Sequence, residues 1–248
     1  METPSSERFP QLFWGLAALG VCMVLMALIG AGAVKSAKRA GDEIEVTGSA
    51  KRSIRSDYAI WRLSSATQSP ALQDAYRDLS ANSARIRRFL TESGVPDSLV
   101  TVKPVETEGV YRMTDQGMQT GELAAYKLTQ RFEVRSADVN RITALSERAA
   151  GLINEGVALQ SSAPEYLYTK LSELRTQMLA SATEDAMRRA EAIATSAGAG
   201  IGAVRSARQG VFQITPRNST EVSDYGINDT SSLEKDITAV VRVTFAVD

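Results

Sequence analysis

The stretch 236–247, "DITAVVRVTFAV", decides the fold class, because its apolar residues recur at every second position. A period of two is typical of a β-strand that buries one face, and it differs from the 3.6-residue period of a helix. The residues expected on the buried face are Ile237, Ala239, Val241, Val243, Phe245 and Val247. Such a strand predicts an antiparallel sheet with one face against a core.

Other stretches of the chain repeat this pattern. "AYKLTQRFEVRS" at 125–136 places Tyr126, Leu128, Phe132 and Val134 on one face and polar residues on the other. This alternation predicts a second strand of the same type. Weaker strand patterns occur at 44–47, 58–64, 100–105, 157–161 and 204–209.

Three segments between these strands have the helical period instead. The first lies between Ser69, a candidate N-cap, and Gly94, a stop signal, and the others cover about 137–155 and 168–197. The first helix should bury Leu72, Tyr76, Leu79, Ile86 and Leu90. The third should bury Leu171, Leu174, Met178, Ala182, Ala186, Ala190 and Ile193, and its alanines let the helix approach a sheet closely. The order of elements predicts an α+β domain, with antiparallel sheets packed with three helices.

Two long segments interrupt the pattern, at 106–124 and 211–235, and we expect them to be long loops or ribbon tips. Both contain more apolar residues than a solvated linker needs, and long segments of this kind inside a domain are often functional. They supply our candidates for an interface between subunits: Tyr111, Met113, Met118, Phe212, Ile214 and Tyr225.

The N-terminal residues 12–34 contain no charged side chain, and about 20 apolar residues suffice for a membrane-spanning helix. We therefore predict a tail at 1–11, a retained transmembrane anchor at 12–34, a linker at 35–42 and the α+β domain at 43–248. The alternative is a leader that is removed after Ala33, because Ala31-Gly32-Ala33 resembles a cleavage site. The residues chosen to represent the anchor are Leu12, Phe13, Trp14, Leu25, Leu28 and Ile29.

The side of the membrane is ambiguous from charge alone. Only Arg8 precedes the anchor, whereas Lys35, Lys38 and Arg39 follow it, and this asymmetry favours a cytoplasmic domain. Long domains can cross the membrane despite such charges.

The composition excludes several kinds of chemistry. The chain has no histidine, so sites that use imidazole as a base or as a metal ligand are absent. Cys22, the single cysteine, lies inside the apolar run, and 28 basic residues against 29 acidic ones give no basic footprint for nucleic acid. "GAGIGA" at 198–203 closes a predicted helix and is interpreted as a helix stop, not as a dinucleotide-binding loop. We expect no catalytic residue, no metal, no cofactor and no nucleic-acid partner, and hence no enzyme.

The segments resemble the SIMPL-domain proteins of bacterial envelopes over most of residues 43–248. The marks of the resemblance are Val46-Thr47-Gly48, Asp57 before a strand, Tyr126 opening a strand, and the alanine-rich helix that ends in glycines. Similar proteins are typically exported, have no assigned enzymatic activity, have been linked to envelope and oxidative stress, and in some cases form rings or cages. The resemblance therefore implies a domain in the periplasm, which the predicted anchor would tether to the bacterial inner membrane.

Two kinds of function remain open. One is a non-catalytic envelope scaffold that assembles into a ring or cage-like homo-oligomer through sheet edges and the two long segments, with itself and the lipid bilayer as partners. The argument for assembly assumes that the regular strand at 237–247 has an edge to protect, with Arg242 as its only guard. The alternative is an envelope binding module for a small molecule, a lipid or a partner protein.

Overall fold

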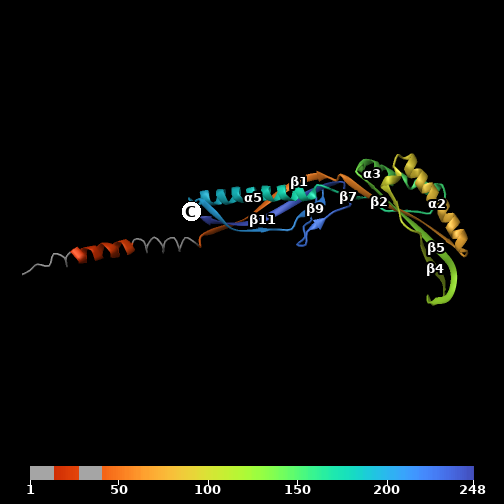
Figure 1. The fold of residues 1–248 in the computed structure, drawn as a ribbon, viewed down its shortest axis with the longest axis horizontal. Helices are drawn as coiled ribbons and strands as arrows, with labels where there is room; N and C mark the ends of the chain where they lie inside the picture. The colour runs from red at the N-terminus through yellow and green to blue at the C-terminus, as the bar shows by residue number, and fades with distance from the viewer. Residues whose placement is uncertain (1–13, 28–40) are drawn as a thin grey trace, which may run out of the picture. The chain divides into compact units, whose positions relative to one another are not determined.

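The computed structural model describes residues 14–27 and 41–248 (Figure 1). Eleven strands and four helices follow residue 41. The strands are β1 (Glu43–Arg55), β2 (Tyr58–Ser69), β3 (Val100–Val102), β4 (Glu106–Met113), β5 (Gln119–Ser136), β6 (Leu159–Ser161), β7 (Glu165–Leu167), β8 (Ile201–Gln209), β9 (Gln213–Pro216), β10 (Ile227–Asn228) and β11 (Glu234–Val247). The helices are α2 (Leu72–Glu92), α3 (Val139–Arg148), α4 (Gly151–Asn154) and α5 (Leu171–Ser196), with a 3₁₀ turn at Asp97–Leu99.

The strands form two sheets. One has six strands in the order β3-β5-β2-β6, with β4 paired with β5 and β7 paired with β2. The other has five strands in the order β1-β11-β9-β10, and β8 also pairs with β11. The β2–β5 pairing is antiparallel, whereas β10 runs parallel to β9. The prediction of an α+β fold with antiparallel sheets is confirmed, although the helix expected at 137–155 is divided into α3 and α4.

The chain divides into two compact units. The first contains the described residues up to Ala50 together with Leu179–Gly210 and Val240–Asp248. The second contains Lys51–Met178 and Val211–Ala239.

In the first unit, α5 packs on β1 through small residues. A Cβ atom added to Gly48 would lie 2.1 Å from the carbonyl oxygen of Ala182 and 2.4 Å from the amide nitrogen of Ala186. Backbone is therefore in contact with backbone at this point, as the alanine-rich sequence of the helix predicts. The buried alanines of α5 in this unit are Ala182, Ala186, Ala190 and Ala194. They recur every four residues, so Ile193, which we expected inside, is rotated out of the stripe and is half exposed.

In the second unit, large side chains fill the core between the helices and the six-stranded sheet. Figure 1 shows α2 lying along β2 and β5. Trp61 and Phe132 are fully buried there, with Ile86, Leu90 and Ile142. Two residues of the predicted α2 stripe, Leu72 and Tyr76, are exposed, because the buried stripe instead begins at Ala75 and continues through Leu79, Ile86 and Leu90.

The position of β11 corrects one premise of the assembly argument. This strand is interior, with β1 on one side and β8 and β9 on the other. All six residues predicted for its inner face are at least half-buried, but the strand has no edge to protect. Arg242 is accordingly not an edge guard, and its guanidinium Nε lies 3.5 Å from a carboxylate oxygen of Glu45.

Candidate functional site

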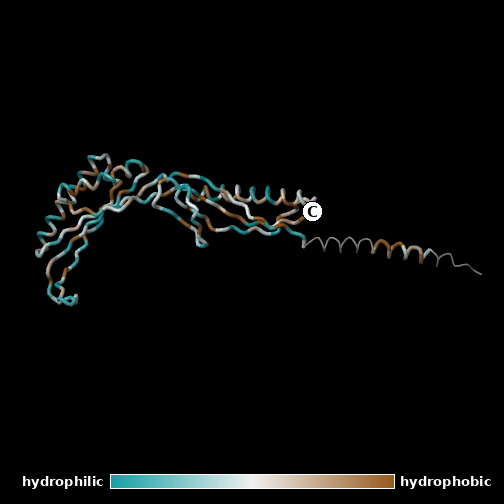
Figure 2. The backbone as a smooth tube through the Cα atoms, turned by 180° about the vertical axis from the view of Figure 1, so that it is seen from behind, coloured by the Kyte–Doolittle hydropathy of each residue, from teal (hydrophilic) through white to brown (hydrophobic). Residues whose placement is uncertain are grey.

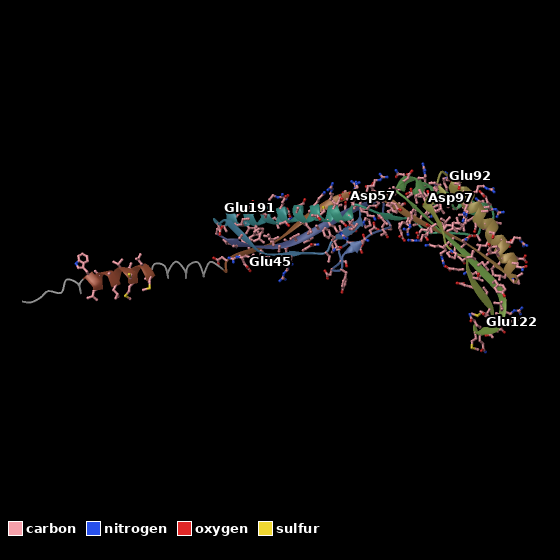
Figure 3. All side chains as sticks on the ribbon, viewed as in Figure 1. Glu45, Asp57, Glu92, Asp97, Glu122 and Glu191 are labelled. Atoms are coloured by element: carbon pink, nitrogen blue, oxygen red, sulfur yellow. The ribbon has the colours of Figure 1, made fainter. Side chains whose placement is uncertain are left out.

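The first long segment, at 106–124, for which we expected a long loop or a ribbon tip, is an ordered ribbon of two antiparallel strands. β4 pairs with β5 from Glu106 opposite Thr129 to Met113 opposite Gln119, and Gly117 makes the turn with a positive φ of 77°. Figure 3 labels Glu122 near the end of this ribbon, where Arg112 forms a cross-strand ion pair with it. The ribbon was one of the two alternatives expected here, but the sequence did not define its strands, because β4 is exposed on both faces and lacks an apolar alternation.

The three interface candidates of this segment lie together at the end of the ribbon. Tyr111 is 44% exposed, and Met113 and Met118 are each 62% exposed. Tyr111 is paired across the ribbon with Leu123, which is itself 40% exposed. The ribbon end therefore exposes a group of apolar side chains beside the charged Arg112 and Glu122.

The three candidates of the second segment do not form one surface. Tyr225 is 98% exposed, and the guanidinium of Arg175 lies 5.5 Å from the centre of the Phe212 ring. Ile214, on β9, is only 4% exposed and pairs with Ile237 of β11. Ile214 is therefore a core residue, and its place among the interface candidates was wrong.

The predicted anchor is described in part. Residues 14–27 form a helix that contains Trp14 and Leu25, and the tube is largely hydrophobic there in Figure 2. Leu12, Phe13, Leu28 and Ile29 lie outside the described residues. Within the described part of the chain, no helix has both the length and the apolar character needed to span a membrane.

A lysine-bearing cavity of about 240 Å³ lies in the second unit, where β1, β7, β9, β10 and β11 meet the start of α5. We call it the Lys235 cavity. Its walls are mainly apolar and aromatic, and include Ile54, Tyr166, Leu167, Tyr168, Leu171 and Ile214. Lys235, from the beginning of β11, is its one basic lining residue, and this residue is only 3% exposed.

Two backbone carbonyls hold the ammonium group of Lys235. Its Nζ donates to the carbonyl oxygen of Tyr166 at 2.7 Å and to that of Asp229 at 2.5 Å. Burial lowers the pKa of Lys235, because removal from water penalises its charged form, and the nearby charge of Asp229 opposes this effect only in part. The site thus contains a buried cation bonded to neutral oxygens.

The carboxylate of Asp229 is engaged by its own loop. Its oxygens accept hydrogen bonds from the amide and hydroxyl of Ser231 and from the amide of Ser232. Burial raises the pKa of Asp229, but the hydrogen bonds from Ser231 and Ser232 and the charge of Lys235 outweigh it, and the pKa is lowered.

Asp57, one of the marks of the resemblance, positions the segment that leads into α5. Its carboxylate accepts hydrogen bonds from the amide of Thr169 at 2.7 Å and from the hydroxyl of Thr169 at 2.8 Å. Thr169 lines the Lys235 cavity, and Figure 3 labels Asp57 beside the start of β2. The aspartate therefore fixes one wall of the cavity.

A second buried charge, Asp236, follows Lys235 on the opposite face of β11. It accepts hydrogen bonds from the Ser53 hydroxyl at 2.7 Å and the Asn218 amide at 3.0 Å, and Lys51 Nζ lies 2.9 Å away. These contacts, led by Lys51, lower the pKa of Asp236 to about 2. Asn218 has a φ of 63°, which is less costly for asparagine than for most residues.

A more polar cavity of about 280 Å³ is lined by Arg62, Arg131 and Glu133 among others. Arg62 Nε lies 3.0 Å from Glu133, and Arg62 also bonds Glu165. Burial raises the pKa of Glu133, but the bonds from Arg135 and Arg62 prevail and lower it. Arg131 is likewise paired with Glu106. Both lining arginines, Arg62 and Arg131, therefore already have carboxylate partners.

Asp185, on α5, contributes to the packing of the first unit. Asp185 accepts a hydrogen bond from the Ser49 amide at 3.0 Å and forms ion pairs with Arg188 and Arg189. The Ser49 hydrogen bond is the main cause of its lowered pKa. Among the described residues, no group of three or more His, Cys, Asp or Glu side chains could hold a metal ion.

Together these features define a class: an α+β protein with two mainly antiparallel sheets, a backbone contact between α5 and β1, and a cavity with a buried lysine. The chain belongs to the SIMPL family, whose model, described as "Protein of unknown function (DUF541)", matches residues 44–245. The resemblance drawn from the sequence is confirmed. A comparison with curated proteins gave no match.

Lys235 was missed in the sequence, although a signal was present. The inner face of β11 continues at period two from Ile237 back to Lys235, so a lysine occupies a position where the pattern predicts an apolar residue. A charged residue on a core face is a reason to look for a partner or a ligand.

Proposed function

We propose that this protein is a non-catalytic, membrane-anchored component of the bacterial envelope that self-associates through the end of the β4–β5 ribbon. The apolar ribbon end carries the proposal. Its exposed residues, Tyr111, Met113, Met118 and Leu123, include the aromatic and methionine side chains that are enriched at protein interfaces.

The ribbon is also preorganised for contact. The antiparallel backbone pairing of β4 with β5 orders the ribbon, so little further order is needed on binding. Exposed cross-strand ion pairs also join Lys127 to Glu108 and Arg112 to Glu122. Among the described strands β4 pairs with β5 alone, which leaves its outer edge available to another strand. A second copy of the same ribbon supplies both a strand edge and an apolar surface.

The uncharged stretch 12–34 supports the membrane anchor, and the family resemblance supports a periplasmic domain. Anchoring confines identical copies to a surface and raises their local concentration, which favours closed symmetric assemblies. In this proposal the protein is a scaffold, and a role in envelope stress is an extension of the same proposal.

The proposal is tested by the particle mass of the full chain in mild detergent, measured by light scattering after size-exclusion chromatography. We expect a uniform assembly for the unaltered chain and a smaller particle for the triple variant Tyr111→Ser, Met113→Ser, Met118→Ser. A matched control replaces two exposed apolar residues elsewhere, Val222→Ser and Met187→Ser, and should keep the large particle. A monomeric unaltered chain, or a triple variant of unchanged mass, contradicts the proposal.

A further inference from the structure

We propose that the Lys235 cavity binds a small monocarboxylate with a short apolar tail. This inference goes beyond self-association, because it concerns the interior of the second unit and does not depend on the ribbon. It combines three features of the described structure: a buried cation, an apolar enclosure and a restricted volume.

The Lys235 ammonium group can donate one further hydrogen bond. A lysine ammonium carries three N–H groups, and the described residues supply two acceptors, the carbonyl oxygens of Tyr166 and Asp229. No ion pair between described residues includes Lys235, although the residue is only 3% exposed. A buried charge without an ionic partner is unfavourable, so a carboxylate that enters the cavity gains a charge-assisted hydrogen bond at a prepared position.

Neighbouring acids limit where the carboxylate can lie. Asp229 lines the cavity, but its carboxylate faces the Ser231 and Ser232 donors, and Asp57 is occupied by Thr169. In the described structure neither side-chain carboxylate is bonded to Lys235 Nζ, which reaches Asp229 through its backbone carbonyl. Their negative charge disfavours a ligand with two or more charges, which is why we infer a monocarboxylate and not a phosphate.

The walls and the volume define the rest of the ligand. Ile54, Leu171 and Ile214 come from three different elements and surround the space with apolar residues. A volume of about 240 Å³ corresponds to about eight water-sized units, given about 30 Å³ for a water molecule in the liquid. A chain of about six carbons with a carboxylate fits this space, whereas a complete phospholipid does not.

The test measures binding of hexanoate to the full chain in mild detergent at pH 7 by isothermal titration calorimetry, with detergent alone as the blank. Hexanol, which has a tail of the same length but no charge, is the matched ligand. We expect one hexanoate per chain and at least tenfold weaker binding of hexanol.

The variant Lys235→Met removes the charge and keeps an unbranched side chain, and it should weaken hexanoate binding at least tenfold. Arg88→Met, on the exposed face of α2, is the matched control and should bind as the unaltered chain does. If Lys235→Met fails to fold, Leu171→Trp fills the cavity while keeping the lysine, and it should also abolish binding.

Three results overturn the proposal: no hexanoate binding at millimolar concentration, equal binding of hexanol and hexanoate, or unchanged binding to a folded Lys235→Met or Leu171→Trp variant. Particle mass reports on the ribbon and hexanoate binding reports on the cavity, so either proposal can fail without the other.

Discussion

The two units are packed in opposite ways. In the first, α5 contacts β1 through Gly48 and a row of alanines, so two backbones touch and the fit depends on the absence of side-chain atoms. In the second, Trp61 and Phe132 fill the core, and the fit depends on their presence. The first unit should therefore be sensitive to added volume and the second to lost volume.

The largest expected effect is the loss of volume in the second unit. Trp61 is fully buried, and its indole N–H donates to the Ser161 hydroxyl at 3.0 Å. Trp61→Ala should lower the free energy of unfolding by about 3–5 kcal/mol, because it leaves a cavity and removes a hydrogen bond. Urea unfolding followed by circular dichroism measures the loss, and hydrogen exchange should place it in peptides of the second unit. A loss of unfolding free energy below about 1 kcal/mol would show that the second unit is not sensitive to lost volume.

Added volume in the first unit should have the next largest effect. Gly48→Ala places a methyl group against the backbone of Ala182 and Ala186, which cannot rotate away as a side chain can. We expect a loss of about 3 kcal/mol, at the upper end of the usual cost of overpacking. Gly151→Ala is the matched control, since a Cβ there meets nothing within 4 Å and alanine favours the helix. Equal stability of the two variants would show that α5 can shift away from β1.

A smaller loss of stability should appear at low pH, because Asp236 of the second unit becomes protonated there. The pKa of Asp236 in the folded state is about 2, below its ordinary value of 3.8, so its contribution to stability is present above pH 3.8. That contribution, on the order of 2 kcal/mol, should be lost as the pH falls from about 4 to about 2.

Urea unfolding across this pH range measures the loss of stability. The Asp236→Asn variant should lack the Asp236 contribution to the free energy of unfolding at every pH. The control is Asp97→Asn at an exposed position, and this variant should lose stability between about pH 4 and about pH 2 as the unaltered chain does. An Asp236→Asn variant as stable at pH 7 as the unaltered chain would show that the carboxylate is not a structural partner of Lys51.

Secondary structure is predicted best from the sequence where an element carries its apolar residues on one face. β11 carries most of its apolar residues on one face and the alanine-rich α5 buries one stripe, so the periods of 2 and 3.6 residues identify them without knowledge of their partners. The burial of Asp236, Thr244 and Ala246 on the other face of β11 is not predicted by this pattern. Gly198 likewise ends α5 with a φ of 74°, and β8 then starts at Ile201, as interpreted from the glycine-rich stretch.

Prediction fails where structure depends on pairing with another segment. The ribbon strands expose both faces, and their order comes from cross-strand contacts, which leave no periodicity in the sequence. The interior position of β11 depends on β1, which precedes it by about 190 residues, and the same pattern of apolar residues is compatible with an edge. The Lys235 cavity combines residues from six segments, and only the lysine itself leaves a local signal.

The position of β11 also affects how the chain is made. It follows β1, β8 and β9 in the chain, yet it lies between β1 and the other two in the sheet. At a synthesis rate of about 5–20 residues per second, β1 emerges roughly ten seconds or more before its partner exists. During that interval β1 lacks its β11 partner, and β8 and β9 join it as strands that wait for β11 once residues 201–216 have been made. Unpaired strand edges are templates for aggregation. A nascent chain interrupted before Glu234 is therefore expected to need a chaperone, and the completed strand closes the sheet in a single late step.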